Sequence, residues 1–329
     1  MTGIKNIFLS FMLMTLVIQC YSQFAGARVI TERLYPNCIE LFNDSIRVVL
    51  EPNLGGRVLA YELNGNNVLY VDATQDGLVY QPDVYIHPSA GRFDIGPERT
   101  IPAHPKLYLD RWIGLITGNR EAQMISQEDT VTGVQLIRKF TLSPSGSRLA
   151  CTQVIRNISK ENKNYCHWSR TFVKGGGIAM APLNPNSRYP EKYLIYGPGK
   201  VMNFQPESEQ NIQIRENVLE ITGTPSQPKI ITDGYQGWLA YLTNDHQLFV
   251  KTYATYPDRI YGEMAANTAC LFYKALYCEI EPIGPMELVE PGKEVSFTEY
   301  WYLFDYQNLA QKKNKGSEVM EIIDHLSRP

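Results

Sequence analysis

Short β-patterned segments separated by turn residues follow one another from residue 28 to about residue 305. In residues 46–63, two runs rich in apolar and β-branched residues flank Pro52-Asn53-Leu54-Gly55-Gly56, and an Asn64-Gly65 turn follows. A second pair of runs covers residues 133–157 and turns at a Pro-Ser-Gly sequence. No linker, composition shift or fixed repeat divides the chain. The pattern predicts one large antiparallel β domain over residues 23–329, and the number of strands favours a sandwich of two big sheets.

Helical periodicity is strong only near the C-terminus. Ser317 is a candidate N-cap residue, and the apolar residues after it recur on one helical face. These residues are Val319, Ile322, Ile323 and Leu326. The fold class expected is therefore all-β with one short C-terminal helix.

The first 22 residues have the pattern of a signal peptide. Lys5 precedes a nearly unbroken apolar stretch from Ile7 to Ile18, and small residues stand before a cleavage site at Gln23. A lipid anchor at Cys20 is the less favoured alternative, because Gln19 stands where such sites prefer a small residue. No later apolar segment is long enough to cross a bilayer. We therefore expect a periplasmic or secreted protein without a transmembrane segment in the mature chain.

Charge and motifs exclude several function classes. Lys and Arg total 31 against 34 Asp and Glu, and no basic run exceeds Lys312-Lys313-Asn314-Lys315, so no nucleic-acid partner is expected. The chain has no dinucleotide fingerprint, Walker loop, nucleophile elbow or zinc-protease motif. The cysteines left after cleavage lack CxxC spacing, which argues against zinc and favours buried thiols. They are Cys38, Cys151, Cys166, Cys270 and Cys278.

The aromatic composition is more informative than the charge. The chain has 21 Tyr and 4 Trp against 12 Phe, which favours rings with a polar edge. Such rings suit β structure and surfaces that stack on sugars.

The segment from Gly91 to Glu98 is the first candidate site. Its glycine and proline content predicts a loop, and it carries Arg92 close to His104 further along. Charged residues on a loop are typical of a binding rim. The alternative is a surface salt-bridge cluster.

The second candidate site is the segment of residues 166–172. If it is a strand, His167, Ser169 and Thr171 face one way, while Trp168, Arg170 and Phe172 face the other. A lone histidine is usually structural, but the adjacent tryptophan and arginine make a functional role equally plausible for His167.

Two further clusters lie in the C-terminal half. Glu279 and Glu281 share one face of an otherwise apolar strand, where like charges raise each other's pKa and suit acid–base chemistry. Exposed glutamates on an edge strand are the alternative. A glycine-rich turn presents Asp233 before Trp238, and turn chemistry alone also explains that aspartate.

Taken in order, these segments resemble the aldose 1-epimerase (galactose mutarotase-like) superfamily over most of the mature chain. The sequence LGGRVLAYELNGNNVLY, residues 54–70, is similar to the early Gly-rich hairpin of that family. Gly91-Arg92-Phe93 resembles its Gly-Arg-aromatic segment, and His104 falls where it has a first active-site histidine. Residues 167–172 look like its second histidine segment, and residues 291–303 like its last hairpin. Glu-Ile-Glu-Pro replaces the usual Leu-Glu-x-Gln, which is typical of a separate, exported branch.

The resemblance implies a β-supersandwich that holds a sugar on its concave face, without metal or cofactor. Either Glu279 or Glu281 would take the proton from the anomeric hydroxyl, and His167 would protonate the ring oxygen. The residues implied or suggested for sugar binding are Arg92, His104, Trp168, Arg170, Asp233 and Trp238. A glycan-binding module without catalysis, a glycoside hydrolase or polysaccharide lyase-associated protein, and a structural envelope protein are the alternatives.

Overall fold

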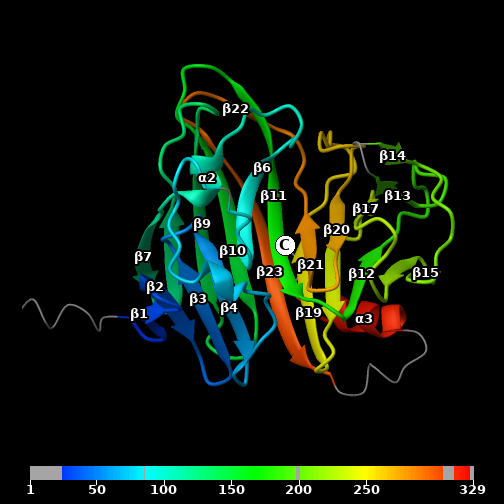
Figure 1. Cartoon of the computed structure of the whole chain (residues 1–329), viewed down its shortest axis with the longest axis horizontal. Coiled ribbons are helices and arrows are strands. Elements are labelled where there is room, and N and C mark those ends of the chain that lie inside the picture. The colour runs from blue at the N-terminus through cyan, green and yellow to red at the C-terminus, as the bar shows by residue number, and fades with distance from the viewer. Residues whose placement is uncertain (1–23, 85, 198–200, 307–314, 327–329) are drawn as a thin grey trace, which may run out of the picture.

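A computed structural model describes residues 24–84, 86–197, 201–306 and 315–326. In these residues two antiparallel sheets lie face to face, and short helices lie at their margins (Figure 1). The predicted class, an all-β supersandwich with a short C-terminal helix, is confirmed. The predicted signal peptide, including Cys20, lies outside the described residues.

The larger sheet contains thirteen of the described strands. Eleven of them are neighbours in the order β1-β2-β3-β4-β6-β11-β21-β20-β17-β13-β14, while β5 pairs with β4 and β22 with β11. Their bounds are β1 Ala27–Glu32, β2 Tyr35–Phe42, β3 Ile46–Glu51, β4 Arg57–Leu63, β5 Asn66–Asn67, β6 Gly91–Gly96, β11 Lys163–Lys174, β13 Tyr193–Tyr196, β14 Met202–Asn203, β17 Lys229–Thr232, β20 Ala269–Tyr273, β21 Tyr277–Pro282 and β22 Glu287–Val289.

The smaller sheet contains ten described strands in the order β15-β16-β12-β18-β19-β23-β10-β9-β8-β7. Their bounds are β7 Ile113–Gly118, β8 Glu121–Ile125, β9 Val134–Leu142, β10 Leu149–Asn157, β12 Ile178–Pro182, β15 Ile212–Arg215, β16 Val218–Ile221, β18 Trp238–Leu242, β19 Gln247–Tyr253 and β23 Glu294–Asp305.

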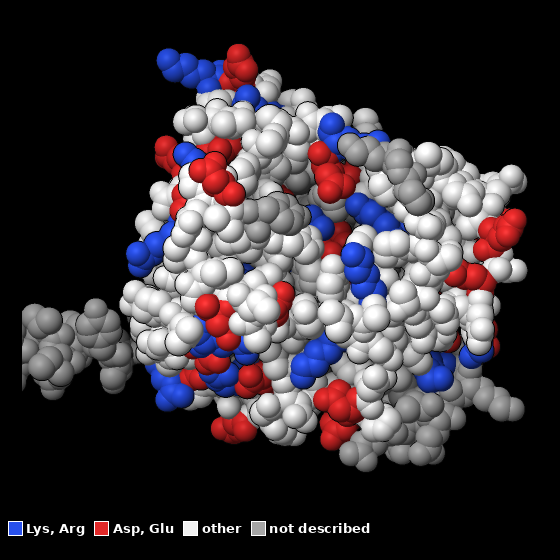
Figure 2. Space-filling model, viewed as in Figure 1, with Lys and Arg blue, Asp and Glu red and all other residues white. Residues whose placement is uncertain are grey.

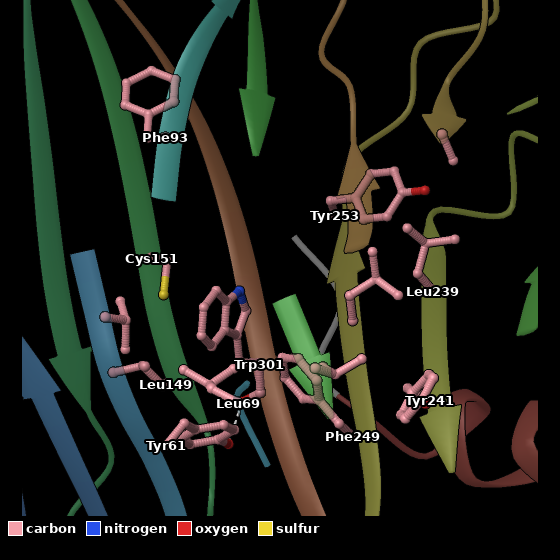
Figure 3. Packing of buried hydrophobic residues seen from close by; sticks show 14 of the residues in the cluster. Tyr61, Leu69, Phe93, Leu149, Cys151, Leu239, Tyr241, Phe249, Tyr253 and Trp301 are labelled. Atoms are coloured by element: carbon pink, nitrogen blue, oxygen red, sulfur yellow. Dashed lines mark hydrogen bonds between the residues drawn. The ribbon is translucent and has the colours of Figure 1, made fainter. Parts of the chain in front are cut away.

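The main hydrophobic core fills the space between the sheets (Figure 3). In strands whose side chains alternate between the two faces of the sheet, every second side chain points into this core. Aromatic rings pack edge to face there: the ring centroids of Tyr61 and Trp301 are 5.8 Å apart, and those of Phe249 and Trp301 are 5.3 Å apart. The five described cysteines are buried and unpaired, as predicted.

The segment from Gly91 to Gly96 is a buried strand, β6, so the predicted loop is wrong. Its glycines mark close approaches instead of turns. A Cβ on Gly91 would lie 2.9 Å from the Trp301 ring, and one on Gly96 would lie 2.7 Å from Cys166 Sγ. The four residues between them alternate between the two faces of the sheet.

The helical elements are short. They are the 3-10 helix η2 Ala73–Gln75, α2 Pro105–Leu109 and α3 Lys315–Asp324. Helix α3 begins two residues before the predicted cap Ser317, so Ser317 lies inside the helix. The helix buries its own residues Val319 and Ile323 in an apolar cluster, as expected. None of the described helices has the length and apolarity needed to cross a membrane.

Candidate functional site

Strand β11 runs through the centre of the large sheet and divides its side chains between two faces. Ser169 and Thr171 face the smaller sheet, where their hydroxyls contact Lys251 Nζ. Trp168, Arg170 and Phe172 therefore point away from the smaller sheet, on what we call the outer face. The predicted alternation of this segment is confirmed.

Neighbouring strands add charged residues to the outer face through their register. Arg92 on β6 lies directly opposite Arg170, and Glu279 on β21 lies directly opposite Phe172. Because paired residues in an antiparallel sheet point to the same side, these side chains share one surface with Trp168. The alternative of exposed glutamates on an edge strand is wrong, since β21 lies between β11 and β20 and both glutamates are buried.

A cavity of about 240 Å³ opens on this face and is called the Arg92 cavity here. Its walls come from β6, β11, the segment before β6 and the region of α2. They include His87, Arg92, Asp94, Glu98, His104, Tyr108, Trp168 and Arg170. Figure 2 shows charged side chains of both signs gathered around a hollow in the middle of the face that β11 and β21 cross in Figure 1.

Glu279 and Glu281 are buried behind the residues that line this cavity, and they have different environments. Arg170 donates to Glu279 Oε2 through Nε at 3.2 Å and Nη2 at 3.1 Å. Burial alone raises the pKa of Glu279, but Arg170 and His87 outweigh it and the net shift is downward. Burial and the nearby charge of Glu279 raise the pKa of Glu281 to about 7. One carboxylate is therefore held ionised, while the other exchanges a proton near neutral pH.

Trp168 links Glu281 to the cavity wall. Its indole Nε1 donates to Glu281 Oε2 at 2.5 Å, and the Arg170 guanidinium lies 4.9 Å from the centre of its ring. These contacts fix the orientation of both the ring and the carboxylate.

Asp94 and His104 form a buried ion pair on another wall. His104 Nε2 lies 2.9 Å from Asp94 Oδ1, and Nδ1 lies 2.7 Å from the Pro102 carbonyl oxygen. Burial lowers the pKa of His104, but the hydrogen bond and charge of Asp94 outweigh this and raise it overall. The pKa of Asp94 is lowered by the same partner, against the effect of burial. Both ring nitrogens have acceptors, so the orientation of the imidazole in the cavity wall is fixed.

Arg92 retains hydrogen-bonding capacity. It is 2% exposed, and its Nε has no hydrogen-bond partner among the described residues. Burial and the like charge of Arg170 lower its pKa to about 10, so it stays protonated at neutral pH. Its guanidinium stacks on Tyr108 and Phe172, at 5.6 Å and 6.0 Å from their ring centres. A buried cation of this kind favours a ligand that supplies oxygen acceptors.

The structure does not bring His167 into this cavity. Its ring lies on the opposite face of β11, stacked between Phe93 and Phe297 with centroids 5.8 Å from each. Burial lowers its pKa to about 3. The predicted role as acid therefore requires a correction, because odd-numbered residues of β11 face the core while Trp168 and Arg170 face the cavity.

Asp233 and Trp238 also lie apart from the Arg92 cavity. Asp233 accepts from Ser187 Oγ at 2.6 Å and from the Arg188 backbone at 2.9 Å, so it holds a loop in place. Trp238 belongs to the apolar cluster under α3, together with Val319. Of the predicted binding residues, the cavity brings together Arg92, His104, Trp168 and Arg170.

Three further side chains belong to this site and were absent from the predicted set. Asp94 lies two residues after Arg92, so in a strand the two side chains share one face. The prediction of a loop at this segment hid that relation. Lys229 is a lone cation at the start of an apolar strand, and its Nζ lies 5.2 Å from the centre of the Trp168 ring. His87 has its Nε2 3.8 Å from Glu279 Oε1, and nothing in the local sequence indicated this contact. No group of three His, Cys, Asp or Glu side chains placed to hold a metal occurs within the described ranges.

Comparisons with known proteins agree with this architecture. No protein-family model and no curated protein matches the chain. Among solved structures, a galactose mutarotase-like protein from Clostridium acetobutylicum superposes with a TM-score of 0.57 at 11% identity, covering 86% of this chain and 100% of the other. The chain has the galactose mutarotase-like fold. A second mutarotase-like protein, from Lactobacillus casei, superposes with a TM-score of 0.56 at 10% identity, covering 81% and 100% of the two chains. A proposed aldose 1-epimerase from Escherichia coli gives 0.57 at 9% identity, covering 80% and 98%.

Proposed function

We propose that the Arg92 cavity binds a sugar and interconverts its anomers. The observation that carries this proposal is the pair of buried glutamates that contact the cavity walls: Arg170 Nη2 lies 3.1 Å from Glu279 Oε2, and Trp168 Nε1 donates to Glu281 Oε2. The mutarotase-like fold supports a carbohydrate ligand, since its structural neighbours include galactose mutarotase-like proteins.

The walls of the cavity offer the two kinds of contact that a pyranose needs. Trp168 supplies an aromatic face for the C–H groups of a sugar ring. Arg92 and the Asp94–His104 pair supply charged groups for its hydroxyls. A cavity of about 240 Å³ suits a small ligand of the size of one monosaccharide.

In the proposed reaction, Glu281 accepts the proton of the anomeric hydroxyl. The bond between the anomeric carbon and the ring oxygen breaks, its electron pair goes to the ring oxygen, and a protonated His87 donates to that oxygen. Rotation of the open-chain aldehyde and the reverse proton transfers close the ring in the other anomer. His87 Nε2 lies 3.8 Å from Glu279 Oε1. His87 thus replaces His167 as the proposed acid.

Polarimetry on freshly dissolved single anomers tests this proposal. The panel is glucose, galactose, mannose and the corresponding uronic acids. For a sugar that wild-type protein converts, Glu281→Gln keeps the shape of the side chain and is expected to lower the catalysed rate by about 100-fold or more. Glu294→Gln, at an exposed glutamate paired with Arg156, is the matched control. An unchanged rate in Glu281→Gln would contradict the role of Glu281.

Sugar binding without catalysis is the second candidate. The observation in its favour is that Glu279 and Glu281 are each only 1% exposed, whereas Arg92, His104, Trp168 and Arg170 line the cavity directly. In that case a sugar raises the melting temperature of wild-type protein and of Glu281→Gln equally, and neither protein changes the rate of anomer exchange.

We also propose that the protein is exported, from the signal-peptide pattern of residues 1–22. Expression of the full chain followed by N-terminal sequencing of the periplasmic and secreted fractions tests this, with Gln23 expected as the first residue. Palmitate labelling lost on Cys20→Ser would favour the lipid-anchored alternative, and retention of the leader in the cytoplasm would contradict export.

A further inference from the structure

A second cavity lies beside the Arg92 cavity on the outer face and is called the Tyr196 cavity here. Its volume is about 640 Å³. Its lining includes Glu98, Arg99, Tyr196, Lys229 and Phe272. Glu98 lines both cavities, so they are direct neighbours.

The strand register places the Tyr196 cavity in line with the glutamate pair. Phe272 on β20 lies directly opposite Glu279 on β21, and Lys229 on β17 lies directly opposite Phe272. Tyr196 on β13 lies opposite Lys229 in turn. A single cross-strand row therefore runs from Glu279 out to Tyr196, all on one face of the sheet.

An ion pair lies where the two cavities meet. It joins Lys229 Nζ, from the lining of the Tyr196 cavity, to Oε2 of Glu98, which lines both cavities, at 3.3 Å. The Glu98 side chain is 47% exposed, and an ion pair with such an exposed partner contributes little to stability. Lys229 Nζ also lies 5.2 Å from the Trp168 ring centre and 5.4 Å from that of Tyr196, so it bridges an aromatic ring of each cavity.

The Tyr196 cavity has the chemistry of a sugar subsite. Half-buried Tyr196 and Phe272 provide apolar ring surface, and Arg99 stacks on Tyr196 with its guanidinium carbon 4.8 Å from the ring centre. Cationic N–H donors beside aromatic faces satisfy both the hydroxyl and the C–H surfaces of a pyranose. Its volume exceeds that of the Arg92 cavity, so it has room for a ring and its linkage.

We propose that the Tyr196 cavity is a second sugar subsite and that the ligand is an oligosaccharide. One unit occupies the Arg92 cavity, the linkage passes over the Lys229–Glu98 pair, and the next unit stacks on Tyr196 and Phe272. This inference rests on the proposed sugar-binding function and extends it from a monosaccharide to a chain of at least two units.

Calorimetric titration of the mature protein with matched sugars tests the proposal. The probes are glucose, galactose, mannose, galacturonate and mannuronate, each compared with its own linear di- and trisaccharide. At least one oligomer is expected to bind roughly tenfold or more tightly than its monomer.

Variants locate the second unit. Tyr196→Leu and Phe272→Leu remove the ring and keep apolar bulk, and each is expected to remove most of the advantage of the oligomer while monomer affinity stays unchanged. Tyr256→Leu, at a ring that stacks on Arg259 outside both cavities, is the control. Circular dichroism and melting temperature verify that each variant is folded.

The outcomes distinguish this inference from the proposed function. If monomers bind as tightly as their oligomers, the second subsite is wrong and the sugar site remains. An oligomer advantage that survives both leucine variants also overturns the subsite. If no sugar of the panel binds, both proposals fail.

Discussion

The two faces of β11 both carry buried charges, yet they differ in how completely those charges are paired. On the face toward the smaller sheet, Lys251 Nζ has Ser169 Oγ at 3.0 Å, Thr171 Oγ1 at 2.7 Å and Glu299 Oε2 at 3.0 Å as partners. Glu299 also accepts from Gln153 and Trp301. This inner pair is held by oxygen and nitrogen partners from three strands, β10, β11 and β23.

The outer face is less completely paired. Arg92 Nε has no partner among the described residues, and Glu281 has a pKa raised to about 7. Fully partnered buried charges specify one arrangement of the core, whereas charges with unused capacity remain able to bind a ligand or exchange a proton. The difference teaches that burial alone does not identify the site. Arg138, between the sheets, also has an unpartnered Nε and Nη2, so it is the adjoining cavity that distinguishes the outer face.

The largest expected effect is on the inner face. Lys251→Met leaves Glu299 buried without its countercharge and is expected to lower the free energy of unfolding by about 3–5 kcal/mol. Urea titration measures the loss, and Lys139→Met at an exposed position of β9 is the control. Sugar affinity of the folded variant is expected to stay at the wild-type value. A stable Lys251→Met variant that had lost sugar binding would show that the inner face carries the binding site and that the outer face does not.

An intermediate effect is expected at the Asp94–His104 pair on the outer face. His104→Gln removes a charge-assisted hydrogen bond, at a cost of about 1.5–3 kcal/mol in stability below pH 6. Since the pKa of His104 is raised on folding, its contribution is complete below the unfolded value and is lost as pH rises through the folded value. In acid the contribution is lost again, because Asp94 becomes protonated as the pH falls through its lowered pKa.

Urea titrations from pH 3 to pH 9 measure this dependence. The difference between wild type and His104→Gln is expected to be largest between about pH 4 and pH 6.5 and to shrink on either side. His325→Gln, at an exposed position, is the control. A difference that stayed constant across this range would show that the pair does not titrate as the structure indicates.

The smallest effect is expected at His167. His167→Phe keeps an aromatic ring between Phe93 and Phe297, so stability at pH 7 is expected to change by less than about 1.5 kcal/mol. Because the folded pKa is about 3, the unfolded state binds the proton first and wild-type stability falls as pH drops from about 6.5 toward 3. The variant is expected to lose this part of the acid sensitivity. Loss of sugar binding or conversion in a folded His167→Phe would restore the role implied by the resemblance.

Local patterns in the sequence were sufficient to predict many strands. Residues 46–51 and 57–63 form β3 and β4 as expected, because alternation and turn residues act within a few positions. Alternation in β11 also predicted which residues share a face. The assignment of His167 to the same site as Trp168 contradicted that alternation, so the resemblance outweighed a local signal that was correct.

Long-range pairing explains what the sequence did not reveal. Nothing near Arg170 indicates that Glu279, 109 positions away, accepts its hydrogen bonds. The loop predicted at Gly91–Glu98 depended on reading glycine as a turn signal, whereas Trp301 and Cys166 approach the backbone there. Asp233 and Trp238 were assigned to the site because of their residue types. The residues that they contact, in the loop at Arg188 for Asp233 and in helix α3 for Trp238, lie in other parts of the chain.

The cross-strand row that builds the site has a consequence for how the protein reaches its native state. Its members come from β21, β20, β17 and β13, and the Arg92 cavity adds β6 and β11, so both cavities exist only after strands from across the whole sequence have paired. Contacts of such sequence separation form slowly. A truncated or half-assembled chain therefore lacks both cavities, and if the proposed sugar site exists, its ligand binding during refolding reports completion of the sheet.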